Sequence, residues 1–118
     1  DTIRENFFRA RIYREGGESW ADIGGVKIAL VTEKLGPASV SLDPRDIIVS
    51  LQEVKSSARN CLPGRVARIE DLGKLVLLGV EAGAEYNVQI THTSFHDLKL
   101  TLGTPIYLTF KSSAVNVF

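Results

Sequence analysis

The sequence predicts an all-β domain with one short inserted helix. Apolar and less apolar residues alternate with a period of two, as in Ile106-Tyr107-Leu108-Thr109-Phe110-Lys111, and this pattern predicts strands with one buried face. Turn signals rich in glycine separate such segments at short intervals. Short strands with regular spacing are typical of a small barrel or sandwich.

The strands that we expect follow the alternating and β-branched segments. In chain order they cover residues 7–14, 19–23, 26–30, 40–43, 46–51, 64–70, 75–80, 86–91 and 106–111. Turns are expected between them at Gly16-Gly17, Gly24-Gly25, Gly36-Pro37, Gly73 and Gly83. The aromatic residues at strand positions that a core would use are Phe7, Phe8, Trp20, Tyr86, Phe110 and Phe118.

One stretch, residues 93–100, has the helical period instead. Phe95 and Leu98 fall on one helical face, and Ser94-x-x-Asp97 resembles a capping box with Asp in the place of Glu. Gly103 and Pro105 then end the helix and restart a strand.

The two halves of the chain resemble each other. Residues 10–15 (ARIYRE) match 64–69 (GRVARI), and residues 39–49 (SVSLDPRDIIV) match 107–117 (YLTFKSSAVNV), each a strand, a polar corner and an apolar strand. Because each half is too small to bury much of a core alone, we expect the halves to pack together or against another chain.

Composition narrows the function classes. The chain has 118 residues with 14 basic and 14 acidic side chains, and this balance disfavours a nucleic-acid binder. No apolar run approaches the length of a spanning helix, and residues 1–6 do not read as a signal peptide. The single cysteine, Cys61, suits a reducing compartment and a small core position. The absence of methionine suggests a fragment or a processed product.

No pattern for catalysis or metal binding stands out. There is no phosphate loop and no nucleophile elbow, so no catalytic residue is predicted. His92 and His96 are four residues apart, but a helix that starts near Ser94 would not bring them together, and no third ligand is evident. Residues 7–14 are the only candidate for stacking on nucleic-acid bases, and strand alternation explains them equally well.

The polar stretch 55–64, KSSARNCLPG, is either an ordinary linker or a loop that holds a ligand. Its segment Ser57-Ala58-Arg59-Asn60-x-Leu62-x-Gly64 resembles the opening motif of the molybdate-binding Mop, or TOBE, domains. Ile90-Thr91-x-x-Ser94 and Lys111-Ser112-Ser113-x-Val115 resemble the two later motifs of that family, in the same order. The resemblance covers residues 56–118 and implies an OB-like, Mop-like β assembly.

The first half resembles a narrower group. Ser41-Leu42-Asp43-Pro44-Arg45-Asp46-Ile47 and residues 6–12 are similar to the regulatory part that follows the nucleotide-binding domain of ABC-transporter ATPases. Asp43 stands where that group usually has Arg, and Arg45 where it usually has Glu, so a local ion pair could persist in reverse. We therefore divide the chain into an ATPase-associated segment, 1–55, and a Mop/TOBE domain, 56–118.

The resemblance implies an oxyanion site for molybdate or tungstate, with no other cofactor and no metal ligands. Its candidate residues are Ser57, Ala58, Arg59, Asn60, Thr91, Ser94, Lys111, Ser112 and Ser113. Backbone N–H groups, hydroxyls and fixed cations suit a dianion whose oxygens only accept hydrogen bonds. For several candidates a structural role remains open: Ser57 and Asn60 could cap the corner, Ser94 could cap the helix, Lys111 could be a solvated rim residue, and Arg59 could contribute only its backbone N–H.

The implied function is that of a regulatory domain in the ATP-binding protein of a molybdate/tungstate importer. Its implied partners are a second copy bound through the Mop-like half, the ATPase domain of the parent chain and, through it, a membrane permease, with no nucleic acid. Its implied location is the cytoplasmic side of the membrane. A storage protein of the molbindin type and the sensor domain of a molybdate-responsive regulator, which use the same module, remain alternatives.

Overall fold

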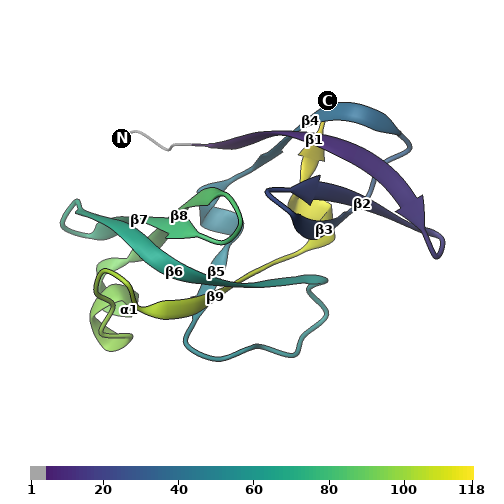
Figure 1. Ribbon diagram of the computed structural model, residues 1–118. Coiled ribbons are helices and arrows are strands. Elements are labelled where there is room, and N and C mark those ends of the chain that lie inside the picture. The colour runs from purple at the N-terminus through teal and green to yellow at the C-terminus, as the bar shows by residue number, and fades with distance from the viewer. Residues whose placement is uncertain (1–4) are drawn as a thin grey trace.

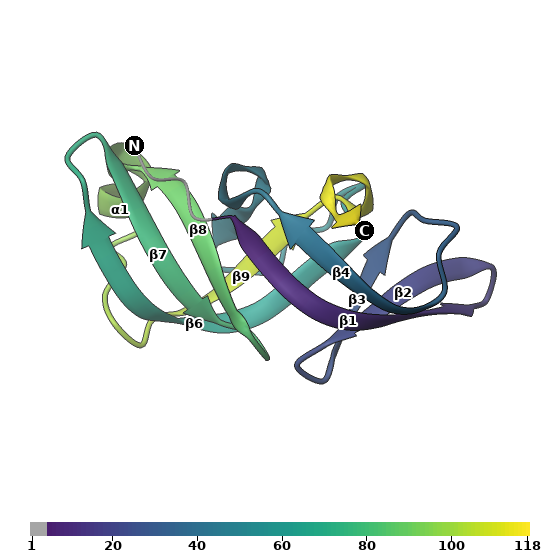
Figure 2. The same ribbon diagram turned by 90° about the horizontal axis from the view of Figure 1, so that it is seen from above.

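The computed structural model describes residues 5–118 as two five-stranded antiparallel sheets and one short helix, α1 (His92–Asp97). Figures 1 and 2 show the two sheets side by side along the long axis of the molecule, with α1 at the outer end of one of them. The all-β fold with a single inserted helix is therefore confirmed.

Each sheet is built mainly from one half of the chain. One contains β1 (Asn6–Glu15), β2 (Glu18–Ile23), β3 (Val26–Leu30) and β4 (Gly36–Leu42). The other contains β6 (Asn60–Asp71), β7 (Leu75–Glu81), β8 (Glu85–Thr91) and β9 (Pro105–Phe110). We call residues 5–55 the first half and residues 56–118 the second half.

The two halves exchange their last strands. β5 (Ile48–Ser50) from the first half pairs with β9, and β10 (Asn116–Val117) from the second half pairs with β4, so the sheet orders are β10-β4-β1-β2-β3 and β5-β9-β6-β7-β8. A single-turn 3₁₀ helix precedes each exchanged strand: η1 (Pro44–Asp46) and η2 (Ser112–Ala114). The buried residues of both halves form one hydrophobic core, so the expectation that the halves pack together is confirmed. The division at residues 55 and 56 stays a prediction.

The internal repeat seen in the sequence is confirmed, with the same alignment. Asn6 faces Leu42 at the end of the β1–β4 ladder, and Asn60 faces Phe110 at the corresponding end of the β6–β9 ladder. Ile48 faces Thr109 and Asn116 faces Ser41, which places the exchanged strands in the same register in both sheets.

Several element boundaries differ from the expected ones. β6 begins at Asn60 rather than Gly64, and Pro63 is tolerated because β6 pairs only with β9 there; its pairing with β7 begins at Arg65. β4 begins at Gly36, where we expected a turn. The helix starts at His92 because Thr91, not Ser94, is its N-cap: the Thr91 hydroxyl accepts a hydrogen bond from the Ser94 N–H at 3.0 Å.

The aromatic prediction was partly wrong. Tyr86 and Phe110 are buried in the core and Phe8 packs against it, but Phe7 and Phe118 are 64% and 56% exposed and contact each other. Phe7 lies between buried Asn6 and half-buried Phe8 and therefore points to the other face of β1. Burial raises the pKa of Tyr86 to about 12, so this phenol stays neutral at any physiological pH.

The hairpin turns of the two halves meet back to back. Gly24 and Gly25 both have positive φ, at 60° and 82°, and join β2 to β3. A Cβ at Gly24 would collide with the backbone carbonyl of Gly83 in the β7–β8 turn, whereas a Cβ at Gly25 would meet nothing within 4 Å.

Comparing the two glycines separates the stability cost of positive φ, which both share, from the cost of the close backbone contact, which only Gly24 makes. Gly25→Ala is expected to cost about 1–2 kcal/mol of unfolding free energy, because alanine disfavours positive φ. Gly24→Ala should cost a further amount of about 1–3 kcal/mol, because the two turns must also move apart. Chemical denaturation of both variants measures the difference, and equal losses would contradict the close contact between the halves.

Candidate functional site

The loop 56–59 and the corner 111–113 meet where β6 begins and β9 ends. Asn60 and Phe110 form the last pair of this ladder, so Arg59 and Lys111 leave the sheet at the same end. We call residues 56–60 and 111–113 together the basic corner. The structure thus brings together seven of the nine candidates: Ser57, Ala58, Arg59, Asn60, Lys111, Ser112 and Ser113.

Asn60 fixes the position of this corner. Its side-chain amide is 3% exposed and pairs with one residue of β3 in both directions: Ala29 donates its N–H to Oδ1 at 2.8 Å and accepts from Nδ2 at 2.9 Å. In the first half, Asn6 makes the same kind of pair with the backbone of Asn87, at 2.6 Å and 2.8 Å. Asn60 therefore holds the basic corner against the first half.

Lys111 and the two serines present hydrogen-bond donors. Lys111 is exposed and occupies the cap position of η2 in an extended conformation, with no side-chain cap bond. Within η2, Ala114 donates its N–H to the Lys111 carbonyl at 3.0 Å. The N–H groups of Ser112 and Ser113 come before that bond, where a helix has no internal acceptors to offer.

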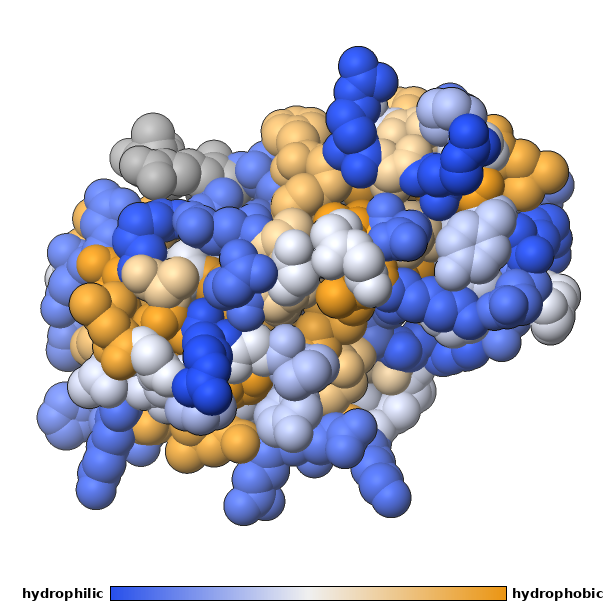
Figure 3. Space-filling model, in the orientation of Figure 1, coloured by the Kyte–Doolittle hydropathy of each residue, from blue (hydrophilic) through white to orange (hydrophobic). Residues whose placement is uncertain are grey.

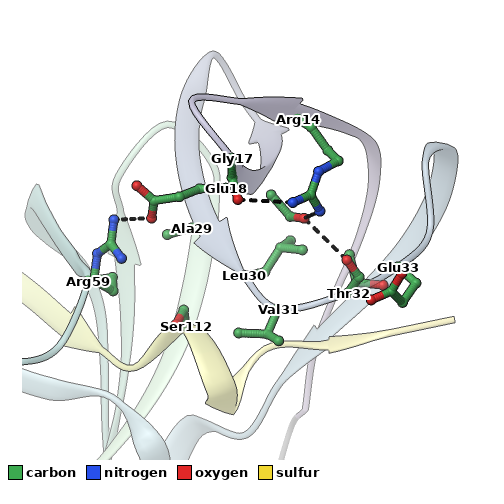
Figure 4. Close-up of a pocket in the computed structure, with 11 residues that line it drawn as sticks. Arg14, Gly17, Glu18, Ala29, Leu30, Val31, Thr32, Glu33, Arg59 and Ser112 are labelled. Carbon is green, nitrogen blue, oxygen red and sulfur yellow. Dashed lines mark hydrogen bonds and ion pairs between the residues drawn. The ribbon is translucent and has the colours of Figure 1, made fainter.

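Two depressions flank the basic corner. One, of about 470 Å³, is lined by Ser57, Ala58 and Lys111, together with Asp46 and Ile48 from the first half. The other, of about 380 Å³, is shown in Figure 4. It is lined by Arg59 and Ser112 and by first-half residues that include Arg14, Glu18 and Glu33.

The structure does not bring Thr91 and Ser94 to the basic corner. They line a separate depression of about 420 Å³ between the end of β8 and the chain around β5. The Thr91 hydroxyl also donates to the Ser94 hydroxyl at 3.0 Å, so the Thr91 cap engages both the backbone and the side chain of Ser94.

The equivalent corner of the first half has the opposite charge. Glu5 and Asp43 occupy the positions that correspond to Arg59 and Lys111. Arg45 binds Asp43 through two side-chain hydrogen bonds, at 3.0 Å and 2.7 Å, which confirms the reversed ion pair expected from the sequence. Asp43 also accepts from the Arg45 backbone N–H at 2.8 Å and so caps η1.

Electrostatics at this first-half corner favour the ionised carboxylate. The side-chain hydrogen bonds from Arg45, with the backbone bond and the guanidinium charge, lower the pKa of Asp43. This corner already contains its own anion, Asp43, whereas the equivalent position of the basic corner holds a cation, Lys111, that makes no side-chain cap bond in η2.

The donor set suits an anion rather than a metal ion. Ammonium, guanidinium and backbone N–H groups only donate hydrogen bonds, and hydroxyls can rotate to donate. Among residues 5–118, His, Cys, Asp and Glu side chains form no group of three that could hold a metal ion. Because the helix begins at His92, His92 and His96 lie one turn apart after all, yet His92 Nε2 lies 3.2 Å from the Asp71 carboxylate.

Arg14, Glu18 and Ala29 reach the site from the first half and were missed from the sequence. They lie 30–45 residues before Arg59 in the chain, inside ordinary alternating strands, and no motif marks them. The packing of β3 against η2 and the hydrogen bonds of Asn60 to Ala29 bring this part of the first half to the corner.

Within residues 5–118, no helix combines the length and apolar character needed to cross a membrane. Charged and polar side chains cover much of the face shown in Figure 3, with apolar side chains exposed among them.

Two known proteins are similar to this chain in sequence. The molybdate/tungstate import ATP-binding protein WtpC of Pyrococcus horikoshii is 39% identical over 97 residues, which are 81% of this chain and 28% of that protein. WtpC of Pyrococcus abyssi is 38% identical over 98 residues, 82% of this chain and 28% of the relative. The chain thus spans little more than a quarter of the length of these relatives.

A solved structure shares the fold. The cytoplasmic molybdate-binding protein ModG, in a crystal form with molybdate bound, superposes with a TM-score of 0.80 and 22% identity, over 95% of this chain and 94% of that one. The model of the TOBE domain family matches residues 56–117. Because this match covers more than half of the chain, the chain belongs to the TOBE domain family.

Proposed function

We propose that this chain is the regulatory domain of the ATP-binding protein of a molybdate/tungstate importer, and that it binds molybdate or tungstate at the basic corner. The observation that carries the proposal is the meeting of the 56–59 loop with Lys111, Ser112 and Ser113, which puts a cation and hydrogen-bond donors where the first half has the Asp43 carboxylate. The 39% identity to WtpC supports the importer context.

The oxyanion would be held by charge-assisted hydrogen bonds. Lys111 supplies a cation, and the hydroxyls and N–H groups of Ser57, Ser112 and Ser113 supply further donors. Each such bond contributes about 1.5–3 kcal/mol, and about four to six of them suffice for a dissociation constant near 1 μM, about −8 kcal/mol. Asn60 then acts by positioning the corner, because its amide is held by Ala29.

A second copy would complete the site. The depression at Lys111 also contains the Asp46 carboxylate, and the one at Arg59 contains Glu18 and Glu33, so the charges of one chain nearly cancel around the corner. A dianion is held best where positive charge exceeds negative charge, and one such corner does not supply that excess. We therefore place the oxyanion between two copies of the second half.

Regulation would follow from this bridging. An oxyanion that binds one arrangement of the two copies more tightly shifts the population toward it, and the attached ATPase domains of the parent chain follow. The chain itself carries out no catalysis in this scheme; it acts at the cytoplasmic side of the membrane, through the ATPase and its permease.

One observation favours a second candidate. The fold likeness to ModG extends over nearly the whole of both chains, so a stand-alone oxyanion-binding protein of that kind has the same architecture. The complete parent sequence discriminates the two, because only the importer subunit carries a phosphate loop ahead of this domain.

Thermal unfolding in the presence of four oxyanions tests the binding proposal. Molybdate and tungstate at millimolar concentration should raise the unfolding midpoint, because a ligand that binds only the folded state stabilises it. Sulfate and phosphate serve as controls for charge and general salt effects. An unchanged midpoint with both molybdate and tungstate would remove the proposed ligand.

A further inference from the structure

Arg59 of the basic corner forms an ion pair with Glu18, the first residue of β2. The guanidinium Nη2 donates to Glu18 Oε1, and the two residues are 41 positions apart in the chain and belong to different halves. Figure 4 shows this pair at the rim of the depression that Ser112 also lines. Both side chains are close to half exposed, at 49% and 43%, so water and ions reach them.

The charges that line this depression sum to zero. Arg14 and Arg59 are balanced by Glu18 and Glu33. Arg14 is held by neutral acceptors, the Ser19 hydroxyl at 3.0 Å and the Gly17 carbonyl at 2.9 Å, whereas Arg59 is held by a carboxylate. Glu18 is therefore the anion that already pairs with Arg59 of the loop 56–59.

An oxyanion next to Ser112 would meet this carboxylate directly. Both groups carry negative charge and both seek the same guanidinium, so they oppose each other at short range. The dianion carries twice the charge of a carboxylate, and exposed ion pairs of the Arg59–Glu18 kind are weak and exchange readily. An exposed contact of this kind can therefore oppose the ligand and still yield to it.

We propose that Glu18 is an internal competitor for Arg59, which lowers the oxyanion affinity of the basic corner and sets the concentration at which it responds. The inference rests on the proposed function and adds to it a residue from the first half. When the oxyanion takes Arg59, the β1–β2 hairpin loses this ion pair to the loop 56–59.

Titration calorimetry with molybdate tests this on the unmodified chain and on Glu18→Gln. The amide is uncharged and nearly isosteric, and we expect it to bind molybdate about two- to fivefold more tightly, the range that an exposed ion pair of up to about 1 kcal/mol allows. The matched control is Glu33→Gln, which removes the same charge from the same depression and is expected to give less than half of that gain. In an Arg59→Ala background, Glu18→Gln should give no gain.

Each alternative outcome has a distinct meaning. An equal gain from Glu33→Gln would make the effect one of general charge and overturn the competition. Weaker binding by Glu18→Gln would make Glu18 a group that positions Arg59, and a persistent gain without Arg59 would also contradict the inference. If molybdate and tungstate bind to neither the unmodified chain nor any variant, the proposed function itself fails; binding with unchanged affinity in Glu18→Gln overturns only the role of Glu18.

Discussion

Asn60→Ala is expected to lower the free energy of unfolding by about 2–5 kcal/mol, because it leaves the buried N–H and carbonyl of Ala29 without partners. The side chain is 3% exposed, so water cannot replace the lost amide without opening the interface between the halves. Asn6→Ala should show a loss of similar size, because its amide pairs in the same way with Asn87. Denaturant unfolding followed by circular dichroism measures both.

Asn116→Ala is the matched control for this prediction. Asn116 lies on β10, is exposed, and makes only a long hydrogen bond of 3.4 Å to the Ser41 hydroxyl. Its replacement should cost no more than about 0.5 kcal/mol, as is usual for surface substitutions. If Asn60→Ala lowered the free energy of unfolding as little as Asn116→Ala does, the Asn60 amide would not stabilise the contact between the halves.

Lys111→Ala is expected to weaken molybdate binding by at least about 1.5 kcal/mol, more than tenfold, because it removes a charge-assisted hydrogen bond to a dianion. The side chain is exposed and makes no cap bond in η2, so the unfolding free energy should change little. Calorimetry on Lys111→Ala beside the unmodified chain gives the difference directly.

Lys74→Ala removes the same charge at the opposite end of the second-half sheet, in the turn between β6 and β7. It should leave molybdate affinity nearly unchanged, since charges far apart at the surface are screened by salt over about 8–10 Å. Equal affinity losses in the two variants would mean that Lys111 acts only through net charge. No loss in either variant would mean that Lys111 is a solvated surface residue and not a ligand.

The repeat was predictable because the pattern of each strand-corner-strand unit survives in the residues. The alignment of 39–49 with 107–117 predicted two equivalent corners, and the pairs Asn6–Leu42 and Asn60–Phe110 confirm it. The exchange of β5 and β10 was not predictable. A period of two shows which side of a strand is buried but does not identify the strand that pairs with it.

The candidate site was predictable only where its residues lie close together in the chain or are linked by a motif. Ser57, Arg59 and Lys111 fall at one ladder end, as the resemblance implied, while Thr91 and Ser94 do not join them. The side-chain amide of Asn60 is a group that could bind an oxyanion. It is hydrogen-bonded to the backbone of Ala29 instead, and no local pattern reveals this contact between residues 31 positions apart. Glu18 was not predictable for the same reason: its contact with Arg59 joins residues that are 41 positions apart.

The most direct test of the central claim is titration calorimetry of the chain with molybdate, under conditions where sedimentation shows a dimer. We predict saturable binding with a dissociation constant of about 1 μM, much tighter than that of sulfate or phosphate. The absence of binding heat with both molybdate and tungstate, in a sample confirmed as dimeric, would contradict the claim that the basic corner is an oxyanion site.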